Sequence, residues 1–212
     1  MSDEKAQLAA AIHRACDLLI EHSHHREALN HALAFLDSVN EILAQGTERT
    51  VEERLTEFAS QMVVPSGAPV VEEGMVFSSF ADSPYSGTEN AVTPTSVQYR
   101  RVGNEVHGDV LLGPSFEGAP GRAHGGTTAA VFDDLMGALQ RVTGFSGYTK
   151  TLEVDYLGPV PTNDTVHFHT SVIAHDETTF TVEAEATYNS RTVATARAVF
   201  TSITPGRFTS PD

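Results

Sequence analysis

The stretch "GRAHGGTTAAVFDDLMGAL", residues 121–139, is the part of the sequence that decides the fold. From Gly126 to Leu139 its only charged residues are Asp133 and Asp134, so a helix formed here is apolar on nearly every face. Such a helix must be surrounded by other elements. Because burying a carboxylate is costly unless it has partners or a task, the two adjacent aspartates need an explanation.

Strand patterns lie on both sides of this helix. Before it, "SVQYRRV" and "EVHGDVLLG" flank Gly103-Asn104, which is a hairpin signal. After it come four segments rich in β-branched and aromatic residues, "YTKTLEVDYLG", "TVHFHTSVIAH", "TFTVEAEATYN" and "TVATARAVFTSI". This order predicts an α+β fold, in which one antiparallel sheet curls around one central helix. Its two open sheet edges predict pairing with a second copy.

Apolar residues in the N-terminal part of the chain follow a helical rather than a strand periodicity. Apolar residues there recur every three to four positions, which predicts helices that form an extension over residues 1–62. A linker is expected at 63–74, the main domain at 75–204 and a tail at 205–212. We expect the helices to serve assembly or shielding rather than chemistry.

Turn-forming residues dominate the segment 77–94, "FSSFADSPYSGTENAVTP", which predicts an ordered loop rather than a repeating element. The single cysteine, Cys16, lies at helical spacing from Ile12 and Leu19 and is predicted to be a small core residue. His22 and His25 are helix neighbours that could hold a metal. No carboxylate or cysteine completes a ligand spacing, which favours a histidine-rich helix surface.

The composition is that of an ordinary globular protein. With 28 acidic and 13 basic side chains, the net charge of −15 disfavours a broad nucleic-acid surface. It is compatible with a small anionic ligand held by a few local groups. No apolar run approaches the roughly 18 residues that a membrane span needs. The acidic N-terminal segment has no targeting pattern, and the expectation is a cytoplasmic protein.

Two features of residues 121–139 could carry chemistry. The N–H groups at a helix start that contains Gly125 and Gly126 are suited to polarising a carbonyl, but a tight turn without a ligand explains the glycines equally well. Asp133 and Asp134 diverge by about 100° around the helix. One can face a cleft while the other meets solvent or a partner subunit, and helical spacing alone does not choose between them.

These residues also carry a family resemblance. "FEGAPGRAHGGTTAAVFDDLMG" followed by "YTKTLEVDYLGPVP" resembles the hotdog-fold acyl-CoA thioesterases of the phenylacetate-pathway (PaaI-like) branch, over residues 75–204. The resemblance implies hydrolysis of an acyl-CoA thioester to free acid and CoA, with no cofactor and no metal. It also implies a homodimer or dimer of dimers whose active site is shared between two chains.

The resemblance assigns roles by position. Asp133, nine residues after His124, matches the catalytic acid, as general base or as nucleophile. The Gly125 N–H matches the group that polarises the thioester carbonyl, and Thr149 matches a hydroxyl that places the water or the carboxylate. His124 matches the residue that ends the loop. The substrate-binding candidates are Gly126, Glu117, Gly118, Arg122 and Lys150. The chain departs from some relatives at Gly118, where they have Asn or Gln, and Glu117 lies beside that position.

Several alternatives remain open in the sequence. Phe132, Met136 and Leu139 could line an apolar tunnel, although core packing suits each of them better. CoA phosphates would need basic side chains, with candidates at Arg122, Lys150, Arg100, Arg101 and Arg141. A non-catalytic acyl-CoA-binding domain competes with the hydrolase. A hotdog hydratase or dehydratase ranks behind both, because those enzymes pair a histidine with a carboxylate at other positions.

Overall fold

The computed structural model of this chain describes residues 2–54, 56, 71–92, 96–145 and 147–202. In chain order its elements are α1 (Ser2–Glu21), α2 (Arg26–Leu43), β1 (Val76–Phe77), β2 (Ser96–Val102), β3 (Glu105–Leu111), η1 (Pro114–Phe116), β4 (Glu117–Ala119), β5 (Arg122–Ala123), α4 (Gly125–Ala138), α5 (Gln140–Thr143), β6 (Gly147–Tyr156), β7 (Thr165–His175), β8 (Thr179–Tyr188) and β9 (Arg191–Ser202). No helix in these described ranges is long and apolar enough to cross a bilayer.

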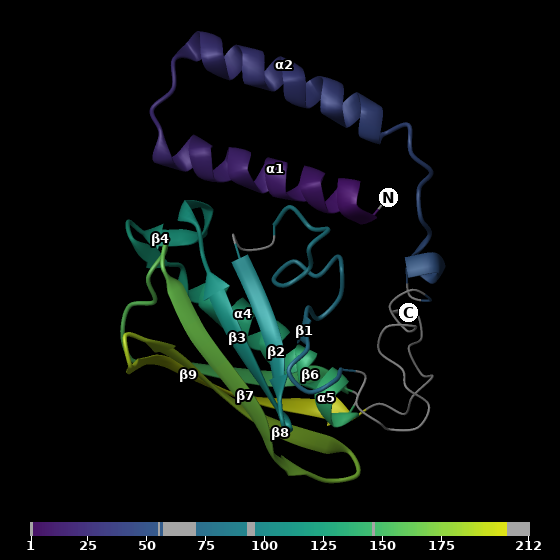
Figure 1. Cartoon of the computed structure of the whole chain (residues 1–212), viewed down its shortest axis with the longest axis vertical. Helices are drawn as coiled ribbons and strands as arrows, with labels where there is room; N and C mark the ends of the chain where they lie inside the picture. Colours follow the sequence, from purple (N-terminus) through teal and green to yellow (C-terminus); the bar gives the residue numbers. More distant parts are fainter. Residues whose placement is uncertain (1, 55, 57–70, 93–95, 146, 203–212) are drawn as a thin grey trace.

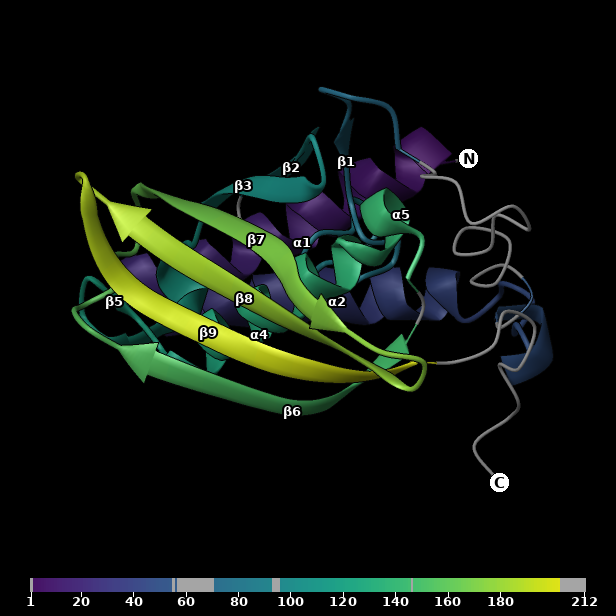
Figure 2. The same cartoon turned by 90° about the horizontal axis from the view of Figure 1, so that it is seen from below.

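One antiparallel sheet forms the body of the domain, with the strand order β1-β2-β3-β7-β8-β9-β6. It curls around α4 (Figures 1 and 2). Val131, Phe132, Leu135 and Met136 of this helix are all fully buried against it. The hotdog fold expected from the sequence is therefore confirmed, and one apolar face of the helix is buried against the sheet.

A β-bulge interrupts the pairing of β6 with β9. Thr149 pairs with Phe200 and Thr151 with Val199, so Lys150 is the extra residue. In a regular strand, Thr149 and Leu152 would point to opposite faces of the sheet. The bulge shifts the alternation, and both are partly buried while Lys150 and Thr151 are exposed. This local irregularity turns the Thr149 side chain toward α4.

The two N-terminal helices lie at one end of the sheet, with α2 on the far side of α1 (Figure 1). Ala9 and His13 of α1 are buried, whereas no residue of α2 is buried by the described part of the chain. Cys16 is exposed. Its prediction as a core residue was wrong, because helical periodicity identifies an apolar face but not whether another element covers that face.

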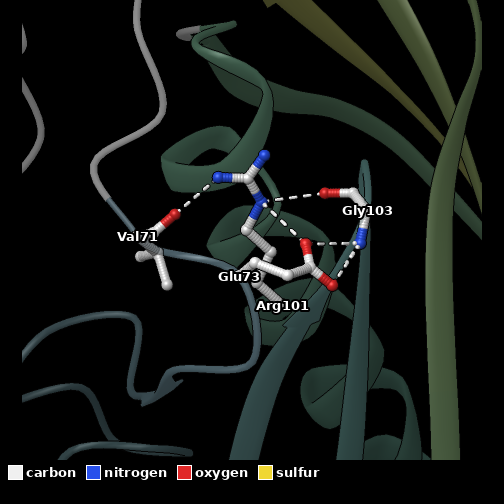
Figure 3. Close-up of polar contacts among 4 residues, drawn as sticks. All are labelled: Val71, Glu73, Arg101 and Gly103. Atoms are coloured by element: carbon white, nitrogen blue, oxygen red, sulfur yellow. Dashed lines mark hydrogen bonds and ion pairs between the residues drawn. The ribbon is translucent and has the colours of Figure 1, made fainter.

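The segment just before β1 is packed onto the sheet. Val71 is 1% exposed and belongs to the core, and its carbonyl accepts a 2.7 Å hydrogen bond from Arg101. Glu73 accepts from the backbone N–H of Gly103 and lies 3.8 Å from Arg101 (Figure 3). The packed domain thus begins by Val71, inside the predicted linker 63–74. The rest of that linker up to residue 70, and the predicted tail at 205–212, lie outside the described residues.

Candidate functional site

Asp133 and Thr149 are brought together by α4 and the bulge in β6. The Thr149 hydroxyl donates a 2.7 Å hydrogen bond to Oδ1 of Asp133, and both side chains are partly buried. They line a pocket of about 350 Å³ that is open on one side. Its other lining residues are Ser79, Phe80, Ser83, Pro84, Tyr85, Ala130, Asp134, Gly137, Gln140, Gly147, Tyr148 and Phe200. The pocket combines carboxyl side chains with largely apolar walls.

Asp134 has its own set of partners. Its Oδ1 accepts a hydrogen bond from the Ser83 hydroxyl at 2.5 Å, and its Oδ2 accepts one from the Tyr99 hydroxyl at 3.0 Å. Burial, and after it the charge of Asp134, raise the pKa of Tyr99 well above its usual range, so the phenol stays protonated and donates. The expectation that one aspartate meets solvent or a partner subunit does not describe Asp134, which binds two buried hydroxyl groups.

The start of α4 is fixed by two side chains. His124 is the N-cap residue, and its Nδ1 accepts a 3.0 Å hydrogen bond from the Gly126 N–H. The Tyr156 hydroxyl donates to the Gly125 carbonyl at 2.6 Å. Among the described residues, none accepts a hydrogen bond from the Gly125 N–H. The first N–H of the helix is thus left available, whereas that of Gly126 is used by His124.

The spacing of these groups along α4 limits what one chain can do. Gly125 and Asp133 are eight residues apart on one helix, which places them about 12 Å apart along its axis. A thioester carbonyl that lies within hydrogen-bond distance of the Gly125 N–H is therefore out of reach of the Asp133 carboxylate of the same chain.

Glu117 and Gly118 shape the loop before α4. Glu117 Oε1 accepts hydrogen bonds from the Gly121 N–H at 2.9 Å and from the Thr162 hydroxyl at 2.8 Å. A side chain at Gly118 would meet the backbone and ring of His124 at 3.0 to 3.3 Å. In the described structure both residues hold the turn that ends at His124.

The basic candidates for CoA phosphates fall into two groups. Arg122, Lys150 and Arg100 are exposed. Arg101 holds Val71 and Gly103, as seen in Figure 3. Arg141 donates to the carbonyls of Ser78 and Ser79, and burial lowers its pKa. The exposed side chains of Arg122, Lys150 and Arg100 can reach a ligand. Those of Arg101 and Arg141 are held by contacts within the chain.

Other sequence candidates lie away from the pocket. Phe132, Met136 and Leu139 are buried in the core between α4 and the sheet and do not line the pocket. His22 and His25 are exposed. In the ranges that the structure describes, no group of three or more His, Cys, Asp or Glu side chains is arranged to hold a metal.

Sequence reasoning missed three residues that support the site, namely Ser83, Tyr99 and Tyr156. Ser83 and Tyr99 lie 51 and 35 residues before Asp134, and nothing in their local pattern indicates the contact. Tyr156 lies in the segment "YTKTLEVDYLGPVP", but nothing in that segment indicates its contact with Gly125. The β-bulge at Lys150 is indicated by the sequence, because polar and apolar residues do not alternate regularly along "TKTLEV".

Comparisons with known proteins agree with this architecture. Residues 120–199 match the family model of the thioesterase superfamily. A crystal structure of a thioesterase superfamily protein aligns over 93% of this chain and 90% of its own, with a TM-score of 0.76 and 21% identity. A hypothetical thioesterase of Streptococcus pneumoniae TIGR4, solved with coenzyme A, aligns over 53% of this chain and 89% of its own, with a TM-score of 0.50 and 18% identity.

A search of the curated proteins finds no match to this chain. The sequence pattern and the fold nevertheless agree with each other. The antiparallel sheet around α4 has the fold of the solved thioesterase superfamily protein, and the matched segment begins just before the turn that ends at His124. The chain therefore has the hotdog fold, and its residues 120–199 match the family model of the thioesterase superfamily.

Proposed function

We propose that this protein hydrolyses an acyl-CoA thioester to a free acid and CoA. The observation that carries the proposal is the hydrogen bond between Thr149 and Asp133 in a pocket with apolar walls. A pocket of this kind offers apolar surface for an acyl group and one carboxylate for the chemistry. The superfamily match over residues 120–199 supports the same reaction class.

In the proposed reaction the Gly125 N–H donates a hydrogen bond to the thioester carbonyl oxygen and stabilises the charge that develops there. Asp133 takes a proton from a water molecule while the water oxygen bonds to the carbonyl carbon. The C–S bond then breaks, and the CoA thiolate leaves and is protonated. The alternative is direct attack by Asp133 to give an anhydride, which water hydrolyses. In both routes Thr149 orients the carboxylate.

The site is proposed to be shared between two copies of the chain. The separation of about 12 Å along α4 keeps Gly125 and Asp133 of one chain from acting on the same carbonyl. Two helices that pack antiparallel about a twofold axis would bring Gly125 of one chain to Asp133 of the other. Among the described residues the sheet ends at β1 and β6, and pairing of a sheet edge is compatible with such a homodimer or a dimer of dimers.

Coenzyme A is the proposed partner on the open side of the pocket. The Streptococcus pneumoniae protein of similar fold was solved with coenzyme A. In this chain Lys150 lies next to Thr149 on β6 and is exposed, and Arg122 is exposed on β5. We propose these two cations for the CoA phosphates, and the loop of Glu117 and Gly118 with Gly126 as the surface beside the thioester.

Two other functions compete with hydrolysis. A hotdog hydratase pairs a histidine with a carboxylate at other positions, whereas His124 caps α4 through its Nδ1. A binding domain without activity would not need the contact between Thr149 and Asp133. Release of free thiol from a panel of acyl-CoA and aryl-CoA esters tests the proposal. Turnover of at least one ester supports hydrolysis, and tight binding of every ester without thiol release would overturn it.

A further inference from the structure

One wall of the pocket comes from a loop outside the matched segment. Residues 78–92, here called the wall loop, contribute Phe80, Pro84 and Tyr85 to the lining. They stand at the pocket that contains Asp133, although they lie about 40 residues before the superfamily match begins at residue 120. The wall loop thus lies before the segment that the family model matches, as do β2 and β3 of the sheet.

Buried hydroxyl groups attach the wall loop to α4. The Ser83 hydroxyl donates to Oδ1 of Asp134, and the Ser79 hydroxyl donates to the Asp134 carbonyl at 3.0 Å. Ser79 and Ser83 are each 1% exposed, so these bonds are made away from water. The Tyr99 hydroxyl occupies the second oxygen of the Asp134 carboxylate. A single aspartate therefore ties the loop to the helix through its side chain and its backbone.

A second attachment comes from Arg141, seven residues after Asp134. Its Nη1 donates to the carbonyls of Ser78 at 2.6 Å and Ser79 at 3.2 Å, and its guanidinium lies 5.5 Å from the centre of the Phe77 ring. The loop is also closed on itself. The Ser86 hydroxyl accepts from the Ser79 N–H, and the Glu89 N–H donates to the Ala81 carbonyl. Together these contacts hold the wall loop in one conformation against α4.

We infer that Asp134 is a positioning residue that locks the wall loop over the pocket, and that the locked loop restricts the substrate to compact acyl groups. The inference rests on the proposed function. A pocket of about 350 Å³ has room for roughly a dozen groups of the size of a water or a methylene, and these must include the thioester and the end of the pantetheine arm. The open side must admit the pantetheine arm of CoA. A long unbranched chain then has no room unless the wall loop moves.

The side chains of the wall explain how the selection works. Phe80, Pro84 and Tyr85 line the pocket together with Tyr148 and Phe200. Such large and rigid side chains do not rearrange around a bound acyl group. They therefore limit the length of the acyl chain rather than select one functional group. Loosening the loop from α4, or removing one of these rings, should therefore have the same result, which is better acceptance of long chains.

The test compares S-butyl-CoA with S-dodecyl-CoA, two thioethers that bind without being hydrolysed, together with the matching thioesters. Wild type is expected to bind the butyl thioether more tightly. Ser83→Ala, which unlocks the loop, and Tyr85→Ala, which widens the pocket, should each reduce this preference by about threefold or more. Thr170→Val removes a buried hydroxyl in the sheet, which donates to the Glu183 carbonyl, and should leave the preference unchanged.

The matching thioesters give the kinetic form of the same result. For the dodecanoyl ester, Ser83→Ala should lower KM more than it changes kcat, because the loop acts on binding and not on the bond that breaks. A wild type that prefers the dodecyl thioether, or variants that keep the wild-type preference, would overturn the inference. Selective thioether binding without release of thiol from the thioesters would overturn the proposed function. It would leave the inference about the wall loop intact.

Discussion

The Thr149 hydroxyl donates a 2.7 Å hydrogen bond to Asp133, and it reaches the helix because a β-bulge at Lys150 turns it inward. Without the extra residue, Thr149 would point to the face of the sheet opposite Leu152. Bulges next to active sites commonly re-aim a side chain in this way. The contact joins two elements that the sequence places 16 residues apart.

Thr149→Ala removes the hydroxyl that orients Asp133. Since a hydrogen bond to a charged group contributes about 1.5 to 3 kcal/mol, kcat should fall by roughly tenfold or more. Thr149→Ser keeps the hydroxyl and should recover most of the turnover, which makes it the matched control. Steady-state thiol release by the three proteins measures the effect. Equal losses for the alanine and serine variants would show that the methyl group, and not the hydroxyl, matters.

His124→Ala removes the side-chain cap of α4. The Gly126 N–H loses its acceptor, and the free energy of unfolding should fall by about 1 kcal/mol. His124→Asn supplies a good N-cap acceptor in place of the imidazole and should recover most of the loss. Urea unfolding of the three proteins measures both. If asparagine restored the stability and also full turnover, the imidazole would have no role beyond the cap.

Tyr99→Phe tests the buried hydroxyl that donates to Asp134. The folded-state pKa of Tyr99 is raised above the ordinary value of about 10, so folding favours the protonated phenol. Its contribution to stability is present below the unfolded pKa and is lost as the pH rises through the folded pKa. Wild type should therefore lose stability above about pH 10 more steeply than Tyr99→Phe. Urea unfolding measures the stability of both proteins across this pH range. An equally steep loss of stability for wild type and Tyr99→Phe would contradict this account.

The sequence predicted the core of the fold because its signals are local. The apolar segment of α4, the Gly103-Asn104 hairpin and the alternation in β8 each determine their own element, and the structure confirms them. The sequence "TVEE" (50–53) is likewise the local pattern of a helix capping box, and Thr50 and Glu53 exchange hydrogen bonds with each other's backbone N–H.

What the sequence could not predict depends on contacts between distant segments. Spacing showed that Asp133 and Asp134 diverge, but the partners of Asp134 come from the wall loop and β2. The exposure of Cys16 likewise depends on which face of α1 is covered, because its neighbour Asp17 does contact Ser115. Periodicity describes one element, whereas burial is a property of its neighbours.

Mixed dimers test whether the site is shared. Gly125→Pro removes the proposed carbonyl donor, and proline is tolerated at the first position of a helix. A refolded equal mixture of Gly125→Pro and Asp133→Asn should reach about a quarter of wild-type turnover, since half of randomly paired dimers contain one intact site. Gly125→Ala keeps the N–H and serves as the control. A mixture no more active than its parents would place both groups in one chain.

The most direct test of the central claim compares Asp133→Asn with Asp134→Asn in the release of free CoA from the best ester of the panel. Asp133→Asn keeps the size of the side chain but removes the base or nucleophile, and kcat should fall by about 10²–10⁴-fold with little change in binding. Asp134→Asn can still accept from Ser83 and should keep turnover within a few-fold of wild type. Equal rates for Asp133→Asn and wild type would contradict the mechanism, whatever the fold.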